Sequence, residues 1–262
     1  MVNVLDLVGS SKLYTNNHRV IAKKSAKILN PSKTVLVPDA DADCPMAHMA
    51  TVERIEEVRR EYEDVAVVCY VNSTAELKTC SDVCVTSANA LKIVQALPNK
   101  NIFFIPDKNL GSFVAEKVKD KKIILNNGCC PIHAKITADM ICAEKKQHSN
   151  ALVLSHPECD DEILKISDYI GSTSEIINYV KSSNNNEFII CTEKGIKYEL
   201  TSNNPQKRFY FPNPNPCCKD MKLNTLEKLL SVLKKEDNEI TISEEIRNKA
   251  LLPLERMLEL GK

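Results

Sequence analysis

One pattern in this sequence constrains the fold more than any other: a hydrophobic run, a short polar loop and a cysteine occur together three times. The three segments are residues 33–44, 122–130 and 208–218. Their final cysteines are evenly spaced, with 86 residues from Cys44 to Cys130 and 88 from Cys130 to Cys218. Each cysteine is followed by the apolar periodicity of an amphipathic helix. Self-similarity at a fixed period predicts structural units that repeat along the chain.

The stretches between these cysteines predict parallel β-sheets in an α/β fold. Hydrophobic runs alternate with polar residues and helix-start signals, which is the pattern of βα units. Residues 49–130 and 131–218 match each other element by element and are predicted to form the second and third units. Residues 1–48 are predicted to form a reduced first unit, which a C-terminal helical segment, residues 219–262, completes and packs on. If three units surround a pseudo-threefold axis, the three cysteines converge on one point.

Charge and hydropathy exclude two classes of partner. The chain has 35 basic and 35 acidic residues and no cluster of Lys and Arg with interleaved aromatic residues, so we expect no nucleic-acid partner. No stretch approaches the roughly 20 apolar residues of a membrane helix, and the first residues lack the pattern of a signal peptide. We therefore expect a cytoplasmic protein that does not bind membranes.

Eleven cysteines in such a chain indicate metal or cluster binding, because disulfides are rare in the cytosol and the number is odd. Five of them lie in apolar patterns and are read as small buried hydrophobic residues: Cys69, Cys80, Cys84, Cys142 and Cys191. The remaining candidates are Cys44, Cys129, Cys130, Cys159, Cys217 and Cys218. Three converging thiolates suit an iron–sulfur cluster with one iron open to ligands. Zinc with three cysteines and a water, or three unrelated core cysteines, are the alternatives.

Polar residues follow the predicted strands at the edge where parallel sheets bind ligands. They supply a phenol, an amide, two imidazoles and a carboxylate, which are groups for binding and proton transfer: Tyr70, Asn72, His133, His156 and Glu158. Each of them alone could serve in an ordinary turn or cap, but together they indicate a site. Ser172 and Thr173 begin a predicted helix and form either an anion site or a plain N-cap.

Nine motifs, eight at these strand ends and one close to the C-terminus, carry a family resemblance. They are Pro38-DADADCPMAHM, Tyr70-VNSTAELK, Thr86-SANA, Pro106-DKNLG, Gly128-CCPIH, Ser155-HPEC, Gly171-STS, Cys218-KDMK and Leu254-ERMLEL. In this order, from about Ala26 to the C-terminus, they resemble the quinolinate synthase family. The resemblance implies three α/β units about a pseudo-threefold axis with a central [4Fe-4S] cluster. It also implies condensation of iminoaspartate with dihydroxyacetone phosphate to quinolinate, in the biosynthesis of NAD, with a functional link to an oxidase or dehydrogenase that supplies the imine.

The resemblance assigns roles to individual residues. Its cluster ligands fall on Cys44, Cys130 and Cys218. Tyr70 and Glu158 would move protons, while His133 and His156 would bind substrate oxygens and take part in catalysis. The positions that would bind the carboxylates or phosphate of the substrates are Asn72, Ser87, Ser172 and Thr173.

The front of the chain departs from the family pattern. The family begins with a strand that ends in a catalytic His-x-Tyr pair, and no such pair precedes Cys44. Ser11, in the short Gly9-SS stretch, takes the place of a substrate-binding serine. This departure leaves a second hypothesis open, in which a shortened iron–sulfur relative binds ligand or senses redox state without full catalysis. Three thiols expected to be exposed, those of Cys129, Cys159 and Cys217, favour that second hypothesis.

Overall fold

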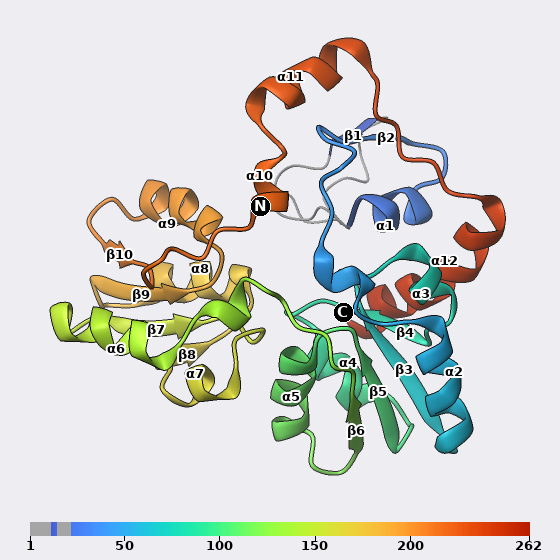
Figure 1. Ribbon diagram of the computed structural model, residues 1–262, viewed down its shortest axis with the longest axis horizontal. Helices are drawn as coiled ribbons and strands as arrows, with labels where there is room; N and C mark the ends of the chain where they lie inside the picture. Colours follow the sequence, from blue (N-terminus) through green and yellow to red (C-terminus); the bar gives the residue numbers. More distant parts are fainter. Residues whose placement is uncertain (1–11, 15–21) are drawn as a thin grey trace.

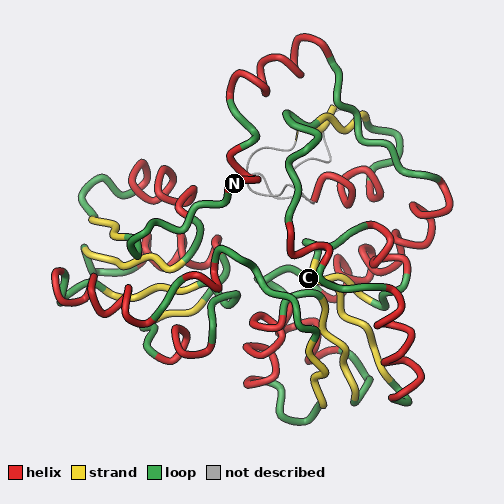
Figure 2. Tube along the Cα trace, in the orientation of Figure 1, coloured by secondary structure: helices red, strands yellow, loops and turns green. Residues whose placement is uncertain are grey.

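The computed structural model describes residues 12–14 and 22–262, and its chain is arranged in three lobes (Figure 1). Two lobes are built on four-stranded sheets, and helices flank the strands of both (Figure 2). Every strand pair within the sheets is parallel. The predicted α/β class with parallel sheets is therefore confirmed.

The first of these sheets has the strand order β4-β3-β5-β6. Its strands are β3 (Val65–Tyr70), β4 (Val83–Val85), β5 (Asn101–Ile105) and β6 (Lys122–Leu125). The helices of this lobe are α2 (Val52–Glu61), α3 (Ala75–Thr79), α4 (Ala90–Ala96) and α5 (Lys108–Lys117). From the second residue onward β3 is fully buried, as expected for a strand covered on both faces.

The second sheet repeats this topology. Its strands are β7 (Leu152–Ser155), β8 (Tyr169–Ile170), β9 (Glu187–Cys191) and β10 (Arg208–Tyr210). The helices are α6 (Ala138–Gln147), α7 (Asp161–Lys165), α8 (Thr173–Ser182) and α9 (Lys197–Asn203). The order β8-β7-β9-β10 corresponds to β4-β3-β5-β6, strand for strand. Tyr70 and His156 occupy equivalent positions in the two sheets. Tyr70 follows Cys69, which pairs with the last residue of β5, and His156 follows Ser155, which pairs with the last residue of β9.

The remaining lobe joins the two ends of the described chain. It contains β1 (Lys12–Tyr14), α1 (Ala22–Leu29), β2 (Thr34–Leu36), α10 (Lys219–Lys222) and α11 (Leu226–Lys235). The Ile240 N–H donates to the Val35 carbonyl at 2.8 Å, and the Val37 N–H donates to the Asn238 carbonyl at 3.2 Å. Ile240 also packs on the small core of Ala26 and Val35. The C-terminal segment thus pairs with residues of the predicted first unit.

The last helix, α12 (Glu244–Leu260), reaches further than expected. Its N-cap is Ser243, whose hydroxyl accepts the Ile246 N–H. The helix contacts α1, in agreement with packing on the first unit, but it contacts α3 and β4 more extensively. Its buried face joins the core of the β3–β6 sheet through Ala250, Leu254 and Met257. The helix therefore links the first lobe to the second.

This packing predicts a large difference between two leucines of α12. Leu254 is fully buried, whereas Leu252 is 68% exposed. Leu254→Ala is expected to lower the free energy of unfolding by about 2–5 kcal/mol, because it leaves a cavity in the core. Leu252→Ala, the matched control, should stay within about 0.5 kcal/mol of the unchanged protein. Urea titrations of the three proteins measure this, and equal effects of the two substitutions would contradict the observed packing.

Candidate functional site

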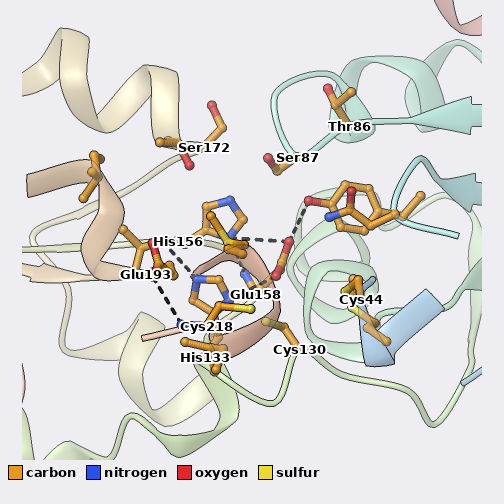
Figure 3. A pocket seen from close by; sticks show the side chains of 18 of the residues that line it. Cys44, Thr86, Ser87, Cys130, His133, His156, Glu158, Ser172, Glu193 and Cys218 are labelled. Carbon is orange, nitrogen blue, oxygen red and sulfur yellow. Dashed lines mark hydrogen bonds and ion pairs between the residues drawn. The ribbon is translucent and has the colours of Figure 1, made fainter. Parts of the chain in front are cut away.

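A cavity of about 210 Å³ lies where the three lobes meet. It opens at the carboxyl ends of strands from both sheets, and Figure 3 shows its side chains. Eleven residues singled out from the sequence line it: Cys44, Tyr70, Asn72, Ser87, Cys130, His133, His156, Glu158, Ser172, Thr173 and Cys218. One further candidate, Ser11, lies outside the described residues. The structure thus gathers residues from seven of the nine motifs into one place.

Three cysteines reach this cavity from three separate parts of the chain. Cys44 directly precedes the 3-10 helix η2 (Pro45–His48), Cys130 lies in the loop after β6, and Cys218 is the N-cap of α10. Burial, with the neighbouring Cys130 as a second cause, raises the pKa of the Cys44 thiol to about 12. Burial also raises the pKa of Cys218. Since a metal binds the thiolate, metal binding here would displace protons.

Glu158 is the centre of a buried polar network. Its Oε1 accepts a hydrogen bond from the Tyr70 hydroxyl at 2.6 Å, and its Oε2 lies 3.0 Å from Nδ1 of His133. Burial alone would raise the pKa of Glu158, but His156, His133 and Tyr70 outweigh it and lower the pKa to about 2. Burial and the Glu158 carboxylate raise the pKa of Tyr70 well above its ordinary value. The pair therefore consists of a protonated phenol and an ionised carboxylate.

The two histidines of the site differ in charge. Their rings stack with centroids 4.8 Å apart. Burial lowers the pKa of His156 to about 4, and its Nδ1 accepts the Glu158 backbone N–H at 3.3 Å, which assigns the proton of the neutral ring to Nε2. Burial would also lower the pKa of His133, but Cys130 and Glu158 raise it well above its ordinary value. His133 is thus the cationic member of the pair.

The low pKa of His156 predicts a dependence of stability on pH. An unfolded histidine takes up a proton near pH 6.5, but the folded one does so only near pH 4. Between these values the unfolded state binds more protons, so this residue's contribution to stability falls as the pH falls. Between pH 7 and pH 5, the metal-free protein should lose on the order of 2 kcal/mol more unfolding free energy than His156→Gln.

Urea titrations at the two pH values measure this difference. Groups that titrate in the range and do not contact His156 are common to both proteins and cancel in the comparison. The control is His48→Gln, since the side chain of His48 is 59% exposed, and this variant should keep the full acid dependence. An acid dependence of His156→Gln equal to that of the unchanged protein would contradict the prediction.

Cys130, His133 and Glu158 also form a group of potential metal ligands. One ligand atom from each lies within 4.8 Å of the others. The Glu158 carboxylate contacts the buried Nδ1 of His133 as an ion pair at 3.0 Å. The opposite ring nitrogen, Nε2, lies 3.0 Å from the Thr192 hydroxyl. Sulfur, nitrogen and oxygen donors therefore converge on the cavity beside Cys130.

Two candidate substrate-binding residues, Ser87 and Ser172, lie across the cavity from these groups. In Figure 3, Ser87 and Ser172 lie above the two histidines, on loops of different lobes. Ser172 is the N-cap of α8, where its hydroxyl accepts the Glu175 N–H and its own N–H donates to the Glu175 carboxylate at 2.7 Å. This capping box confirms the N-cap interpretation. An anion site at this helix end stays a prediction.

Several residues of the site were missed from the sequence. Thr192 and Glu193 line the cavity after β9, and Asp43 lines it beside Cys44. Asp107 is fully buried behind Cys130, and burial with the nearby Glu158 raises the pKa of Asp107 to about 7. A signal for two of them was present: Asp107 and Glu193 both lie two residues beyond the third strand of their sheets.

Two expectations about the other cysteines are wrong. Cys159, expected to be an exposed thiol, is fully buried, because it packs in the core beneath β7 and β9. Cys142, expected to be buried, is exposed on α6. The expected burial of Cys69, Cys84 and Cys191 and the expected exposure of Cys217 are confirmed. Cys80, expected to be buried, and Cys129, expected to be exposed, are both half-buried.

Known proteins resemble this chain over most of its length. The family model for quinolinate synthetase A protein matches residues 21–259. A quinolinate synthase of Fusobacterium nucleatum is 52% identical over 238 residues, which is 91% of this chain and 79% of the relative. Quinolinate synthases of Clostridium perfringens and Clostridioides difficile are each 48% identical, again over 91% of this chain and 79% of the relative. No helix among the described residues is long and apolar enough to cross a membrane.

Proposed function

The chain belongs to the quinolinate synthase family, and we propose that it is the enzyme that condenses iminoaspartate with dihydroxyacetone phosphate to quinolinate. Quinolinate is the precursor of the pyridine ring of NAD. One structural observation supports this function most directly: three cysteines and the Tyr70–Glu158–His133 network line the same cavity. The relatives reported above do not favour the second hypothesis, a ligand-binding or redox-sensing protein without full catalysis.

We propose that Cys44, Cys130 and Cys218 hold a [4Fe-4S] cluster. The donor set fits this group, because three thiols from three lobes border one cavity and a cluster with three protein ligands keeps one iron open. When bound, the cluster would supply a Lewis acid for carboxylate and hydroxyl oxygens. Cys129 and Cys217 are neighbours of the ligands in the sequence and are not included in the set.

The arrangement of the lobes supports a pseudo-threefold architecture around this cluster. Residues 49–130 and 131–218 each contain one sheet of the same strand order. The first unit, residues 1–48, would be completed by residues 219–262, in line with the hydrogen bonds between residues 35–37 and residues 238–240. One cysteine from each unit then faces the axis, which accounts for the even spacing of the three in the sequence.

The buried network supports specific roles in proton transfer. The Tyr70 phenol, hydrogen-bonded to the ionised Glu158 at 2.6 Å, is placed to give a proton to substrate, and the carboxylate is placed to accept one. Both groups are removed from bulk water, so protons exchanged between them and the substrate are not lost to solvent. They would therefore act in the enolisation and dehydration steps of the condensation.

The remaining polar groups would bind the substrates. The cationic His133 suits an anionic oxygen, and the Nε2–H of neutral His156 can donate to a hydroxyl or carbonyl oxygen. Asn72, Ser87 and Thr173 add amide and hydroxyl donors for a carboxylate or phosphate from the other walls of the cavity. The substrates are small molecules, and a cytoplasmic location with a separate oxidase or dehydrogenase as the source of imine accords with this function.

An oxygen-free assay of the 262-residue chain tests the proposal. The protein is reconstituted with iron and sulfide, supplied with dihydroxyacetone phosphate, and given iminoaspartate formed in situ from oxaloacetate and ammonium. We expect quinolinate, identified by mass spectrometry, and no product without either substrate. A protein that carries the cluster and binds dihydroxyacetone phosphate but forms no quinolinate would support the second hypothesis instead.

A further inference from the structure

Asp107 connects the end of β5 to the loop that carries Cys130. Its Oδ1 accepts the backbone N–H groups of Asn109 and Leu110, both at 2.9 Å, and so caps α5. Its Oδ2 accepts the backbone N–H of Cys130 at 3.2 Å, across 23 residues of sequence. Asp107 is fully buried and lies outside the cavity lining. One carboxylate thus joins a helix start to a candidate cluster ligand.

Glu193 makes the corresponding connection in the other sheet. Its Oε2 accepts the Gly195 N–H at 2.5 Å and caps the 3-10 helix η4 (Lys194–Ile196). Its Oε1 accepts the Cys218 N–H at 3.2 Å, across 25 residues, and lies 3.3 Å from Nζ of Lys222. Each of the two carboxylates therefore uses one oxygen for a helix start and the other for the backbone of a cysteine.

The backbone around the two carboxylates repeats as well. The Lys108 N–H donates to the Gly128 carbonyl at 2.7 Å, and the Lys194 N–H donates to the Pro216 carbonyl at 2.8 Å. In both cases the residue after the carboxylate binds the residue two before the cysteine. Gly128 is required for this approach, because a Cβ there would lie 2.5 Å from the Pro106 carbonyl oxygen. The same backbone contact therefore occurs in both units, and in the unit that carries Gly128 it requires a glycine.

We infer that Asp107 and Glu193 are positioning residues that fix Cys130 and Cys218 in the direction needed to hold the cluster. This inference rests on the function proposed above. Each carboxylate binds the cysteine backbone and so sets where the Cα–Cβ bond points, while the adjoining strand and helix hold the carboxylate itself. The third ligand has a local version of the same bond, since the Cys44 N–H donates to the side chain of Asp43 at 2.8 Å.

The isosteric amides distinguish this role from simple filling of space. Asp107 and Glu193 act as acceptors on both oxygens, but an amide has one acceptor oxygen and a nitrogen that only donates. Asp107→Asn and Glu193→Gln must therefore turn an N–H group either toward the helix start or toward the cysteine N–H. In one orientation the cysteine N–H loses its acceptor, and in the other the helix start does, which leaves two N–H groups unpaired beside Asp107 and one beside Glu193. Either way the side chain no longer joins the helix start to the cysteine.

The test compares the rate at which a chelator removes iron from the reconstituted, oxygen-free proteins. Loss of supporting contacts behind a metal ligand typically weakens metal binding by about 10- to 100-fold, and we expect iron to leave Asp107→Asn and Glu193→Gln faster by a factor in this range. The electron paramagnetic resonance spectrum of the reduced cluster should change in both variants. Circular dichroism of the apo-proteins checks that they fold, and if one variant does not fold, the other carries the test.

Asp168→Asn is the matched control. The Asp168 carboxylate also accepts a backbone N–H, that of Val153 at 2.8 Å, but at the opposite edge of the β7–β10 sheet. We expect this variant to keep both the iron-release rate and the spectrum of the unchanged protein. Unaltered rates in Asp107→Asn and Glu193→Gln, or equally fast release from Asp168→Asn, would overturn the inference. An unchanged protein that takes up no cluster would instead overturn the proposed function, so the two failures are distinguishable.

Discussion

Replacement of Cys44, Cys130 or Cys218 by serine is expected to remove the iron–sulfur chromophore and quinolinate formation together. A hydroxyl is a poor substitute for a thiolate as an iron–sulfur ligand. With only two protein ligands left, the cluster would be held from two lobes instead of three. The unchanged, reconstituted protein should contain about four irons per chain. Each variant should fall close to zero in iron content and in the visible absorption of the cluster.

The chain supplies matched controls next to two of the three ligands. Cys129 precedes Cys130 and Cys217 precedes Cys218, and neither adjacent thiol is among the residues that line the cavity. Cys129→Ser and Cys217→Ser should therefore keep the full iron content. Loss of iron in all five variants alike would show that cluster binding does not depend on the converging thiols. A protein that binds zinc in place of iron and sulfide would exclude the cluster directly.

The parallel sheets could be predicted because their strands have a strong local signal. The runs Val65–Tyr70 and Glu187–Cys191 are hydrophobic, short and followed by polar residues, and both strands proved to lie at the centre of their sheets. The convergence of Cys44, Cys130 and Cys218 on one cavity was also predictable, from their even spacing. When a motif recurs at a fixed period and each unit of the fold places it at the end of the same strand, the copies of that motif lie close together in the structure.

Long-range contacts of single side chains had no such signal. Asp107 and Glu193 read as ordinary helix caps, and their second bonds, to Cys130 and Cys218, depend on how two loops approach each other. Cys159 follows a strand end as the site residues do, yet it turns into the core. The periodicity of α12 shows that the helix has an apolar face, but it does not show which part of the protein that face packs against. Its position against β4 could therefore not be predicted.

Glu158→Gln is expected to slow quinolinate formation by about 10²–10⁴-fold, with a much smaller change in substrate binding. Glutamine keeps the shape of the side chain and can still accept the Tyr70 hydrogen bond, but it cannot take up a proton. It also removes the negative charge that lies 3.0 Å from Nδ1 of His133. Steady-state kinetics of the cluster-loaded protein should therefore show a large fall in kcat with KM nearly preserved.

The control and a second variant separate proton transfer from other effects. Glu162→Gln changes an exposed carboxylate four residues away and should leave kcat unchanged. Tyr70→Phe removes the proton at the other end of the 2.6 Å hydrogen bond and should also lower kcat severely. Because the phenol and the carboxylate act as one pair, the double variant should be scarcely slower than the worse single variant. Multiplicative losses would show that the two groups serve separate steps, and a normal kcat in Glu158→Gln would place the proton transfers on other residues of the cavity.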